Sequence, residues 1–379
     1  MTLKINSKEL PLSSTFLSYS SERRELVGSG INGLEFYSLD TDSLRTIGLE
    51  LRAVLDGVVC SGAGIVVLAS FPLQEELSAE LRGQVESIRD SYRQTMSPSD
   101  FESYWADFGH FWPMWLSGRS SRKLLSISRD SWKVLAVKDS ETYEGLYRSE
   151  CTDLALLIGE DDDLNLSRIN AASLDVLWKT TVKNAGAYSI DTSGSCCSVL
   201  SGNEIISIGM GDGIVNRREP IPVDSDVNLW GALTEVETGF YLAGYTGGPT
   251  GMKICQTRTG QPQATPVFVS SGIELFKTIP LVAKYKAREC RCCDFCLSRL
   301  VWVPEVSRLV LHASISTDPA GGGDEMANGI FAVDPITGAC ETCLITDECS
   351  TGTLSCLGDG KLLYSGDNGD FLITLNEQA

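Results

Sequence analysis

The sequence is poor in histidine and lacks long apolar runs. Only two of the 379 residues are histidines, His110 and His312, and no nucleophile motif accompanies either of them. A histidine-based triad or a zinc protease site of the HExxH type therefore has almost no residues from which to form. No stretch approaches the roughly 18 consecutive apolar residues of a membrane-spanning helix. The first residues, "MTLKINSKELPLSS", lack a basic region followed by an apolar one, so we expect no secretory signal.

Basic residues are also scarce, and this limits the partners. Lys and Arg number 31 against 50 Asp and Glu, which gives a net charge of −19. Such a chain repels the phosphates of nucleic acids and anionic lipids, so we expect neither a nucleic acid nor a membrane as partner. General solubility explains this charge in many proteins. The alternative is an acidic face that attracts a basic protein.

The 13 cysteines are an odd number in a large chain without a secretory signal. This combination favours reduced thiols and a cytoplasmic location over a disulfide framework.

Most of the chain alternates between apolar and polar residues in short runs that end in Gly, Asn or Asp turns. This period of two predicts half-buried antiparallel strands. Units of three or four such strands cannot bury both faces alone, and radial stacking into a β-propeller solves this. The sequence predicts an all-β propeller of about seven four-stranded blades in a single domain over residues 1–379. The predicted unit starts lie near Leu12, Leu51, Arg122, Gly186, Asn228, Phe276 and Gly352.

The last predicted unit has only three clear strands. The N-terminal segment "TLKINSKEL" is the candidate for the fourth strand, which would close the ring and remove two free sheet edges.

Two segments carry a family resemblance. "NGIFAVDPITGACET" (Asn328 to Thr342) resembles the repeat of quinoprotein-like β-propellers, and "SRINAASLDVLWKTTV" is similar to the end of that repeat. The resemblance implies a propeller of the quinoprotein or WD40 type. It does not extend to quinone chemistry, because no cofactor residues match.

Residues 74–116 break the β pattern and predict a helical insertion in the second blade. Leu77, Leu81, Val85, Ile88 and Tyr92 form one apolar stripe at helical spacing. A second helix is expected to begin at "SPSD" (Ser97 to Asp100), with Ser97 as the N-cap, and to end at Pro113.

The insertion is also rich in aromatic residues. "FESYWADFGHFWPMWL" has more aromatic surface than one buried helix face can cover. These residues are either a small second core or anchors for a protein partner. The candidate partner-binding residues are Tyr104, Trp105, Phe108, Phe111, Trp112 and Trp115.

Two CxxC pairs suggest a possible metal site. Cys293 with Cys296 and Cys340 with Cys343 resemble the ligand pairs of a tetrahedral Cys₄ zinc site, although 43 residues separate them. A disulfide or redox role and plain packing of small thiols are the alternatives.

Taken together, these features favour a non-catalytic cytoplasmic protein that binds a protein partner through a propeller face and the aromatic insertion. A stoichiometric inhibitor or immunity-type antagonist of a basic toxin or enzyme fits the charge. The alternatives are an assembly scaffold and a propeller hydrolase or lyase that uses loop carboxylates. No single residue is assigned a catalytic role.

Overall fold

The computed structural model describes residues 3–377 except for short segments, namely 12–16, 21–22, 31–32, 50–52, 61–63, 73–77, 118–119, 140–144, 149–153, 161–162, 191–194, 222–223, 248–249, 261–262, 281, 283–289, 320–324, 349–351 and 367–368. Over the described residues the strands form seven antiparallel sheets of four strands each. We number these sheets as blades 1 to 7 along the chain.

The first four blades run in chain order, and each is a meander. Blade 1 is β2 (Leu17–Ser20), β3 (Glu25–Gly30), β4 (Gly33–Ser38) and β5 (Ser43–Gly48); blade 2 is β6 (Val54–Cys60), β7 (Ile65–Pro72), β8 (Ser120–Ile127) and β9 (Val134–Asp139); blade 3 is β10 (Gly145–Arg148), β11 (Leu154–Glu160), β12 (Asp163–Asn170) and β13 (Val176–Lys183); blade 4 is β14 (Ala185–Ile190), β15 (Cys196–Ser201), β16 (Glu204–Gly209) and β17 (Val215–Pro220).

The last three blades complete the ring. Blade 5 is β18 (Val227–Val236), β19 (Gly239–Thr246), β20 (Gly251–Arg258) and β21 (Ala264–Ser271), followed by the short helix α4 (Gly272–Leu275); blade 6 is β22 (Cys290–Val303), the 3-10 turn η2 (Pro304–Val306), β23 (Arg308–Pro319), β24 (Glu325–Val333) and β25 (Cys340–Glu348); blade 7 is β26 (Thr353–Gly358), β27 (Lys361–Gly366), β28 (Gly369–Glu377) and β1 (Leu3–Leu10).

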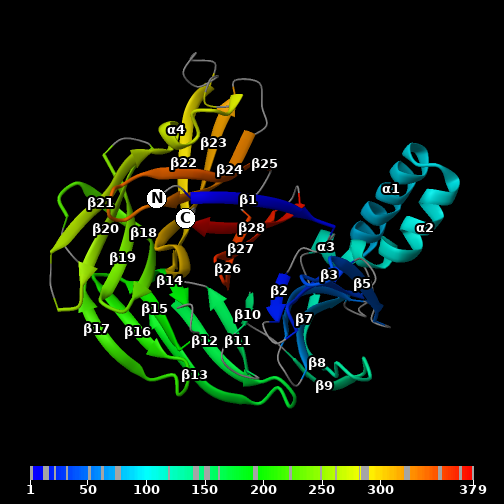
Figure 1. Ribbon diagram of the computed structural model, residues 1–379. Helices are drawn as coiled ribbons and strands as arrows, with labels where there is room; N and C mark the ends of the chain where they lie inside the picture. Colours follow the sequence, from blue (N-terminus) through cyan, green and yellow to red (C-terminus); the bar gives the residue numbers. More distant parts are fainter. Residues whose placement is uncertain are drawn as a thin grey trace.

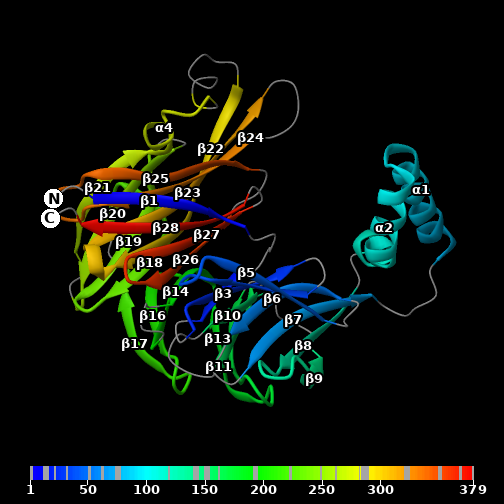
Figure 2. The same ribbon diagram turned by 45° about the vertical axis from the view of Figure 1, so that its right-hand side comes forward.

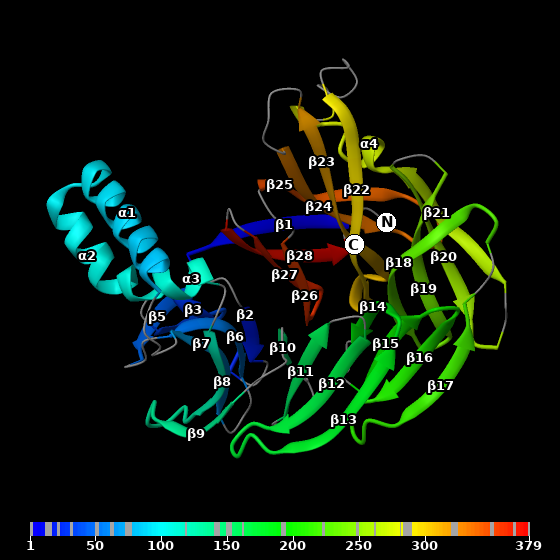
Figure 3. The same cartoon turned by 180° about the vertical axis from the view of Figure 1, so that it is seen from behind.

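The blades surround a common axis, as Figures 1 and 3 show. An apolar core lies at each of the seven junctions between neighbouring blades in the described part of the chain. At the junction of blades 1 and 2, for example, Phe36 packs with Val67 and Leu125. Full burial of one such side chain contributes about 1.5–3 kcal/mol, so the junctions account for most of the stability of the ring.

The first strand closes the ring. β1 pairs with β28 over eight residues, from Leu3 opposite Glu377 to Leu10 opposite Asp370. Leu10 then packs against Leu26 and Tyr37 of blade 1. The predicted closure of the last blade by the N-terminal strand is confirmed, and so is the β-propeller with four-stranded blades.

Two of the predicted unit starts were wrong. Arg122 lies inside β8, the third strand of blade 2, because the helical insertion separates β8 from β7. Phe276 directly follows α4, and blade 6 begins only at Cys290.

Among the described residues, four blades share one six-residue turn between their third and fourth strands. In blade 6 the N–H of Asp334 donates to the carbonyl of Ala339, and the N–H of Gly338 donates to the carbonyl of Asp334. Asp334 Oδ1 also accepts the N–H groups of Ile336 and Thr337, and Gly338 has a φ of +69°. The resembling segment "DPITGA" therefore encodes this turn in blade 6, where Asp334 supplies the side-chain acceptor and Gly338 takes the left-handed conformation.

The same turn in blades 2 and 3 has bulky residues at the left-handed position. Trp132 and Leu174 have φ values of 56° and 61°. Leu174 is buried in the core between blades 2 and 3, and the ring of Trp132 lies 5.1 Å from that of Phe36 in blade 1. Packing across the junctions therefore outweighs the local preference for glycine here.

Candidate protein-interaction surface

A helical insertion, residues 79–117, interrupts blade 2 between β7 and β8. It consists of α1 (Ala79–Thr95), α2 (Pro98–Phe108), the 3-10 turn η1 (Gly109–Phe111) and α3 (Trp112–Ser117). Pro72 and Ser120, the residues that bracket it, are partners in the β7–β8 ladder. The insertion therefore replaces a hairpin turn, and Figure 2 shows that α1 and α2 project away from the blades.

Local signals in the sequence set the helix ends. The side chains of Ser78 and Ser97 accept the N–H groups of Leu81 and Asp100, as N-caps do. The N-cap predicted at Ser97 is confirmed. The helix end predicted at Pro113 is wrong, because α2 ends at Phe108 and Pro113 is the second residue of α3. Proline is tolerated there because the first turn of a helix needs no N–H donor.

The aromatic residues of the insertion pack mainly on one another. The rings of Tyr92 and Tyr104 stack with centroids 4.9 Å apart, and Trp112 lies 5.9 Å from Tyr92. Phe101 stacks on Trp105 at 5.9 Å. This arrangement joins α1, α2 and α3 into one small unit.

The burial of the six predicted partner-binding residues differs from one to the next. Phe111 is buried, whereas Tyr104, Trp105 and Trp112 are half-buried. The side chains of Phe108 and Trp115 lie outside the described residues. Half-buried aromatic rings that stand off the ring of blades are suited to a protein contact, because each still has apolar area to bury.

Burial and charge define the chemistry of this surface. The half-buried position of Tyr104 and its neighbour Tyr92 raise the pKa of Tyr104 to about 12, so its hydroxyl stays neutral. The sequence of α2 contains Asp100, Glu102 and Asp107 but no Lys or Arg, and the first two are exposed. The insertion therefore combines aromatic area with an acidic second helix.

The two CxxC pairs lie on different strands of blade 6. Cys293 and Cys296 are in β22, Cys340 and Cys343 are in β25, and β23 and β24 lie between them. Three strand spacings place the two backbones about 14 Å apart. Zn–S bonds are only about 2.3 Å long. The strand order therefore does not bring the two predicted ligand pairs together, and zinc binding by Cys293, Cys296, Cys340 and Cys343 stays a prediction.

Burial raises the pKa of the Cys343 thiol to about 12, so the free thiol stays protonated. The side chain of Cys293 lies outside the described residues. Where the structure describes side chains, no group of three or more His, Cys, Asp or Glu is placed to hold a metal.

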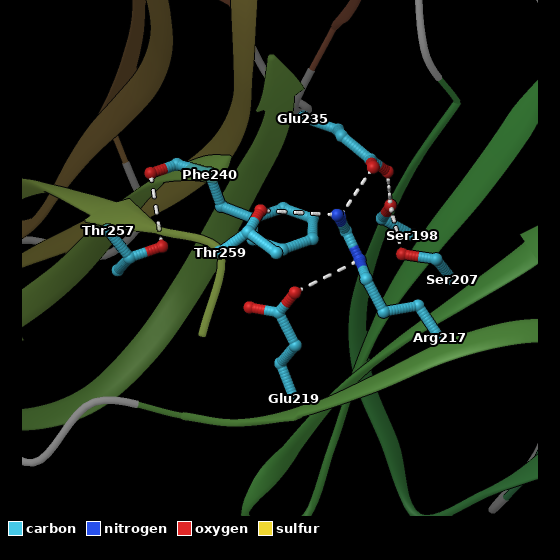
Figure 4. A network of polar contacts seen from close by, with 8 residues as sticks. All are labelled: Ser198, Ser207, Arg217, Glu219, Glu235, Phe240, Thr257 and Thr259. Carbon is cyan, nitrogen blue, oxygen red and sulfur yellow. Dashed lines mark hydrogen bonds and ion pairs between the residues drawn. The ribbon is translucent and has the colours of Figure 1, made fainter. Parts of the chain in front are cut away.

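A polar cluster at the junction of blades 4 and 5 was not predicted. We call it the Arg217 clasp, and Figure 4 shows it. Arg217 of β17 lies 2.5 Å (Nη2) from Glu235 Oε1 of β18 and 3.2 Å (Nε) from Glu219 Oε1. The guanidinium also lies 4.6 Å from the ring centre of Phe240, and Ser198 donates to Glu235. Both carboxylates serve the arginine, so the clasp joins two blades and does not resemble a free acid–base pair.

His312 is buried and structural. It lies in β23 at the junction of blades 6 and 7, where its ring meets Tyr364 edge-on at 5.5 Å. Burial, opposed by the hydrogen bond with Asn328 and assisted by the charge of Arg299, lowers the pKa of His312 to about 4. A neutral imidazole with so low a pKa is a poor general base. The side chain of His110 lies outside the described residues.

No family model matches the sequence, and no curated protein sequence does. Solved structures with a similar fold include a chain of a mitotic checkpoint complex, at 8% identity and a TM-score of 0.48, covering 98% of this chain and 94% of that one. A second is the β-propeller domain of Cps50 (Swd1) from Myceliophteria thermophila, with 8% sequence identity and a TM-score of 0.49, covering 99% of this chain and 100% of that one. A third is BamB from Moraxella catarrhalis, with 10% identity and a TM-score of 0.47, covering 99% of this chain and 100% of that one. These similarities do not indicate what this chain binds.

Proposed function

We propose that this chain is a non-catalytic protein that binds a basic protein partner through the helical insertion of blade 2. The β-propeller is a fold commonly used for protein–protein interaction. The observation that carries the proposal is the aromatic unit of the insertion, which stands off the ring with half-buried tyrosine and tryptophan rings.

The acidic character of α2 supports a basic partner. Asp100 and Glu102 are exposed in the first half of this helix, and the chain as a whole has a net charge of −19. Such a field accelerates association with a basic protein and weakens at high salt.

The consequence of binding depends on which surface of the partner is covered. If binding covers the active surface of that partner, this chain acts as a stoichiometric inhibitor or immunity-type antagonist. If it does not, the chain acts as an assembly scaffold. The 13 cysteines suit a reducing compartment, so a cytoplasmic location is part of the proposal. None of the described helices is long and apolar enough to cross a membrane.

The test separates binding from folding. The tagged chain captures its partner from a native lysate, the partner is identified and purified, and affinities are measured by calorimetry. We expect Trp105→Ala and Trp112→Ala to weaken binding by roughly 30- to 1000-fold, the usual cost of an interfacial tryptophan. Their melting temperatures should stay close to that of the unchanged chain, because the insertion contributes little to the ring.

Trp302→Ala is the matched control. Trp302 is also half-buried and stacks on Tyr241 at 5.8 Å, but it lies on blade 6. Its replacement should lower the melting temperature and leave the partner affinity unchanged.

A charge variant tests the electrostatic part of the proposal. Glu102 and Ala106 are both exposed and lie one turn apart on α2, so the helix can accept lysine at both positions. The Glu102→Lys, Ala106→Lys double variant should weaken binding and reduce its dependence on salt. Normal binding by both tryptophan variants of the insertion would refute the proposal.

A further inference from the structure

A second surface lies on the outer strands of blades 2 and 3. β9 and β13 expose five large apolar side chains, each between 39% and 57% exposed. We call this set the Val-Leu rim, and its members are Val134, Leu135, Val137, Val176 and Leu177. Scattered exposed apolar residues are normal, whereas apolar residues gathered on the outer strands of adjacent blades suggest an interaction surface.

The two halves of the rim occupy equivalent positions. The ladder between the third and fourth strands contains a bulge in each blade, which leaves Leu135 and Leu177 as the unpaired extra residues. Blade 4 has the same bulge, but Asn216 is its extra residue. The exposed leucines of blades 2 and 3 are therefore not required by the bulge itself.

An ion pair links the two halves. Lys138 Nζ of β9 lies 2.6 Å from Oδ1 of Asp175, which directly precedes β13. The ion pair ties the end of β9 to the turn that precedes β13, so a partner that spans both blades can reach the apolar side chains of both outer strands.

The charge of the rim is opposite to that of the whole chain. Residues 133–139 and 175–183 contain four lysines and two aspartates, whereas the chain has 31 basic and 50 acidic residues. Both aspartates are engaged, Asp175 with Lys138 and Asp139 with Lys123 at 3.5 Å. Lys133, Lys179 and Lys183 are exposed and have no ion pair among the described residues.

We propose that the Val-Leu rim docks a protein segment that carries both apolar and acidic side chains. The apolar side chains cover the leucines and valines, and the carboxylates pair with the free lysines. Contact through side chains is favoured over addition of a strand to β9, because the bulge at Leu135 interrupts the free edge of that strand. This surface is independent of the helical insertion, and its partner has the opposite charge.

A defined peptide pair tests the proposal. The probe is a fluorescein-labelled nine-residue peptide that alternates valine or leucine with glutamate, and its matched peptide has lysine in place of glutamate. Fluorescence anisotropy at low salt should show binding of the acidic peptide on the order of 100 µM, as expected for a small contact. The basic peptide should bind at least about tenfold more weakly.

Variants of the chain locate the site. Leu135→Ser with Leu177→Ser, and separately Lys179→Glu, should each weaken binding of the acidic peptide about tenfold or more. The matched control is Ile336→Ser, since Ile336 is 91% exposed and is the only exposed large apolar side chain among the described residues of blade 6. Trp105→Ala should leave peptide binding unchanged, which separates this proposal from that for the insertion.

Three outcomes would overturn the inference. The first is no binding of the acidic peptide at about 1 mM, far above the expected affinity. The second is equal loss of binding in Ile336→Ser. The third, seen by sedimentation, is a dimer of the unchanged chain that the double serine variant dissociates, since the rim would then be covered by a second copy of this chain.

Discussion

The blade junctions and the helical insertion bury apolar side chains to different extents. At the junctions, Phe36, Phe240, Phe331 and Tyr364 are all at most 1% exposed. In α1 no residue is buried, and the predicted apolar stripe is half-buried at Leu81, Val85, Ile88 and Tyr92. Its first member, Leu77, lies outside the described residues. The buried cores therefore couple each blade to its neighbours, while the insertion depends on its own few aromatic contacts. Stability and partner binding are assigned to different parts of the molecule.

Removal of β1 should have the largest effect on the ring. Deleting residues 1–10 removes eight ladder pairs, the buried Leu3 and Leu10, and the contacts of Lys8 with Tyr37 and Asp42. It also leaves β28 as a free edge next to an opened junction. We expect the truncated chain to lose its sharp thermal transition and to aggregate, as measured by calorimetry and light scattering.

The control for this truncation lies in the same strand. Asn6→Thr, an exposed change in β1, should melt normally. A truncated chain that melts as sharply as the full chain would rule out closure by β1.

A second test concerns the Arg217 clasp at the junction of blades 4 and 5. Arg217→Met leaves Glu219 and Glu235, which are 13% and 20% exposed, without their shared cation. Breaking a largely buried pair leaves an uncompensated charge, so we expect a loss of about 2–3 kcal/mol in the free energy of urea unfolding. Arg218→Met is the control, because its pair with Glu204 is half exposed and should contribute less than about 0.5 kcal/mol. Equal losses in the two variants would show that the clasp does not join the blades.

Sequence patterns identified the parts of the molecule that repeat locally. The period of two, the "DPITGA" turn and the N-cap at Ser97 are local signals, and each led to the correct element. The Arg217 clasp has no such signal, because its partner Glu235 lies on the next blade and only the stacking of blades brings them together.

The cysteine pairs show the same limit. CxxC spacing reports that two thiols are close along the chain, but the strand order decides whether two pairs can meet. In blade 6 that order places β22 and β25 at opposite edges of the sheet. The exposed leucines of the Val-Leu rim were also missed, because an apolar run such as "VLAVKD" predicts a strand without predicting which of its faces is covered.

Acid should weaken the junction of blades 6 and 7. Burial lowers the pKa of His312 from its ordinary 6.5 to about 4 in the folded chain, so between these values the unfolded chain binds the proton more readily. The contribution of His312 to the free energy of unfolding is therefore fully present above the pKa of the unfolded state, and it is lost as the pH falls toward the pKa of the folded state. We expect the free energy of unfolding to be about 2 kcal/mol lower at about pH 5 than at about pH 7 from this residue. In His312→Gln that difference should shrink by the same amount. An unchanged pH dependence in the variant would contradict the assignment.

The smallest effect on stability is expected from removal of the insertion, and this tests the comparison most directly. Pro72 and Ser120 already face each other in the β7–β8 ladder, so a short Gly/Asn turn can replace residues 73–119. Because no residue of α1 is buried, the shortened chain should unfold in one sharp transition within about 1 kcal/mol of the full chain. It should also lose capture of the basic partner and keep its affinity for the acidic peptide, since the Val-Leu rim remains. If the shortened chain instead unfolds broadly, the insertion is a cap that the ring requires, and the aromatic residues belong to a second core. If it folds and still captures the partner, the binding surface lies on the blades.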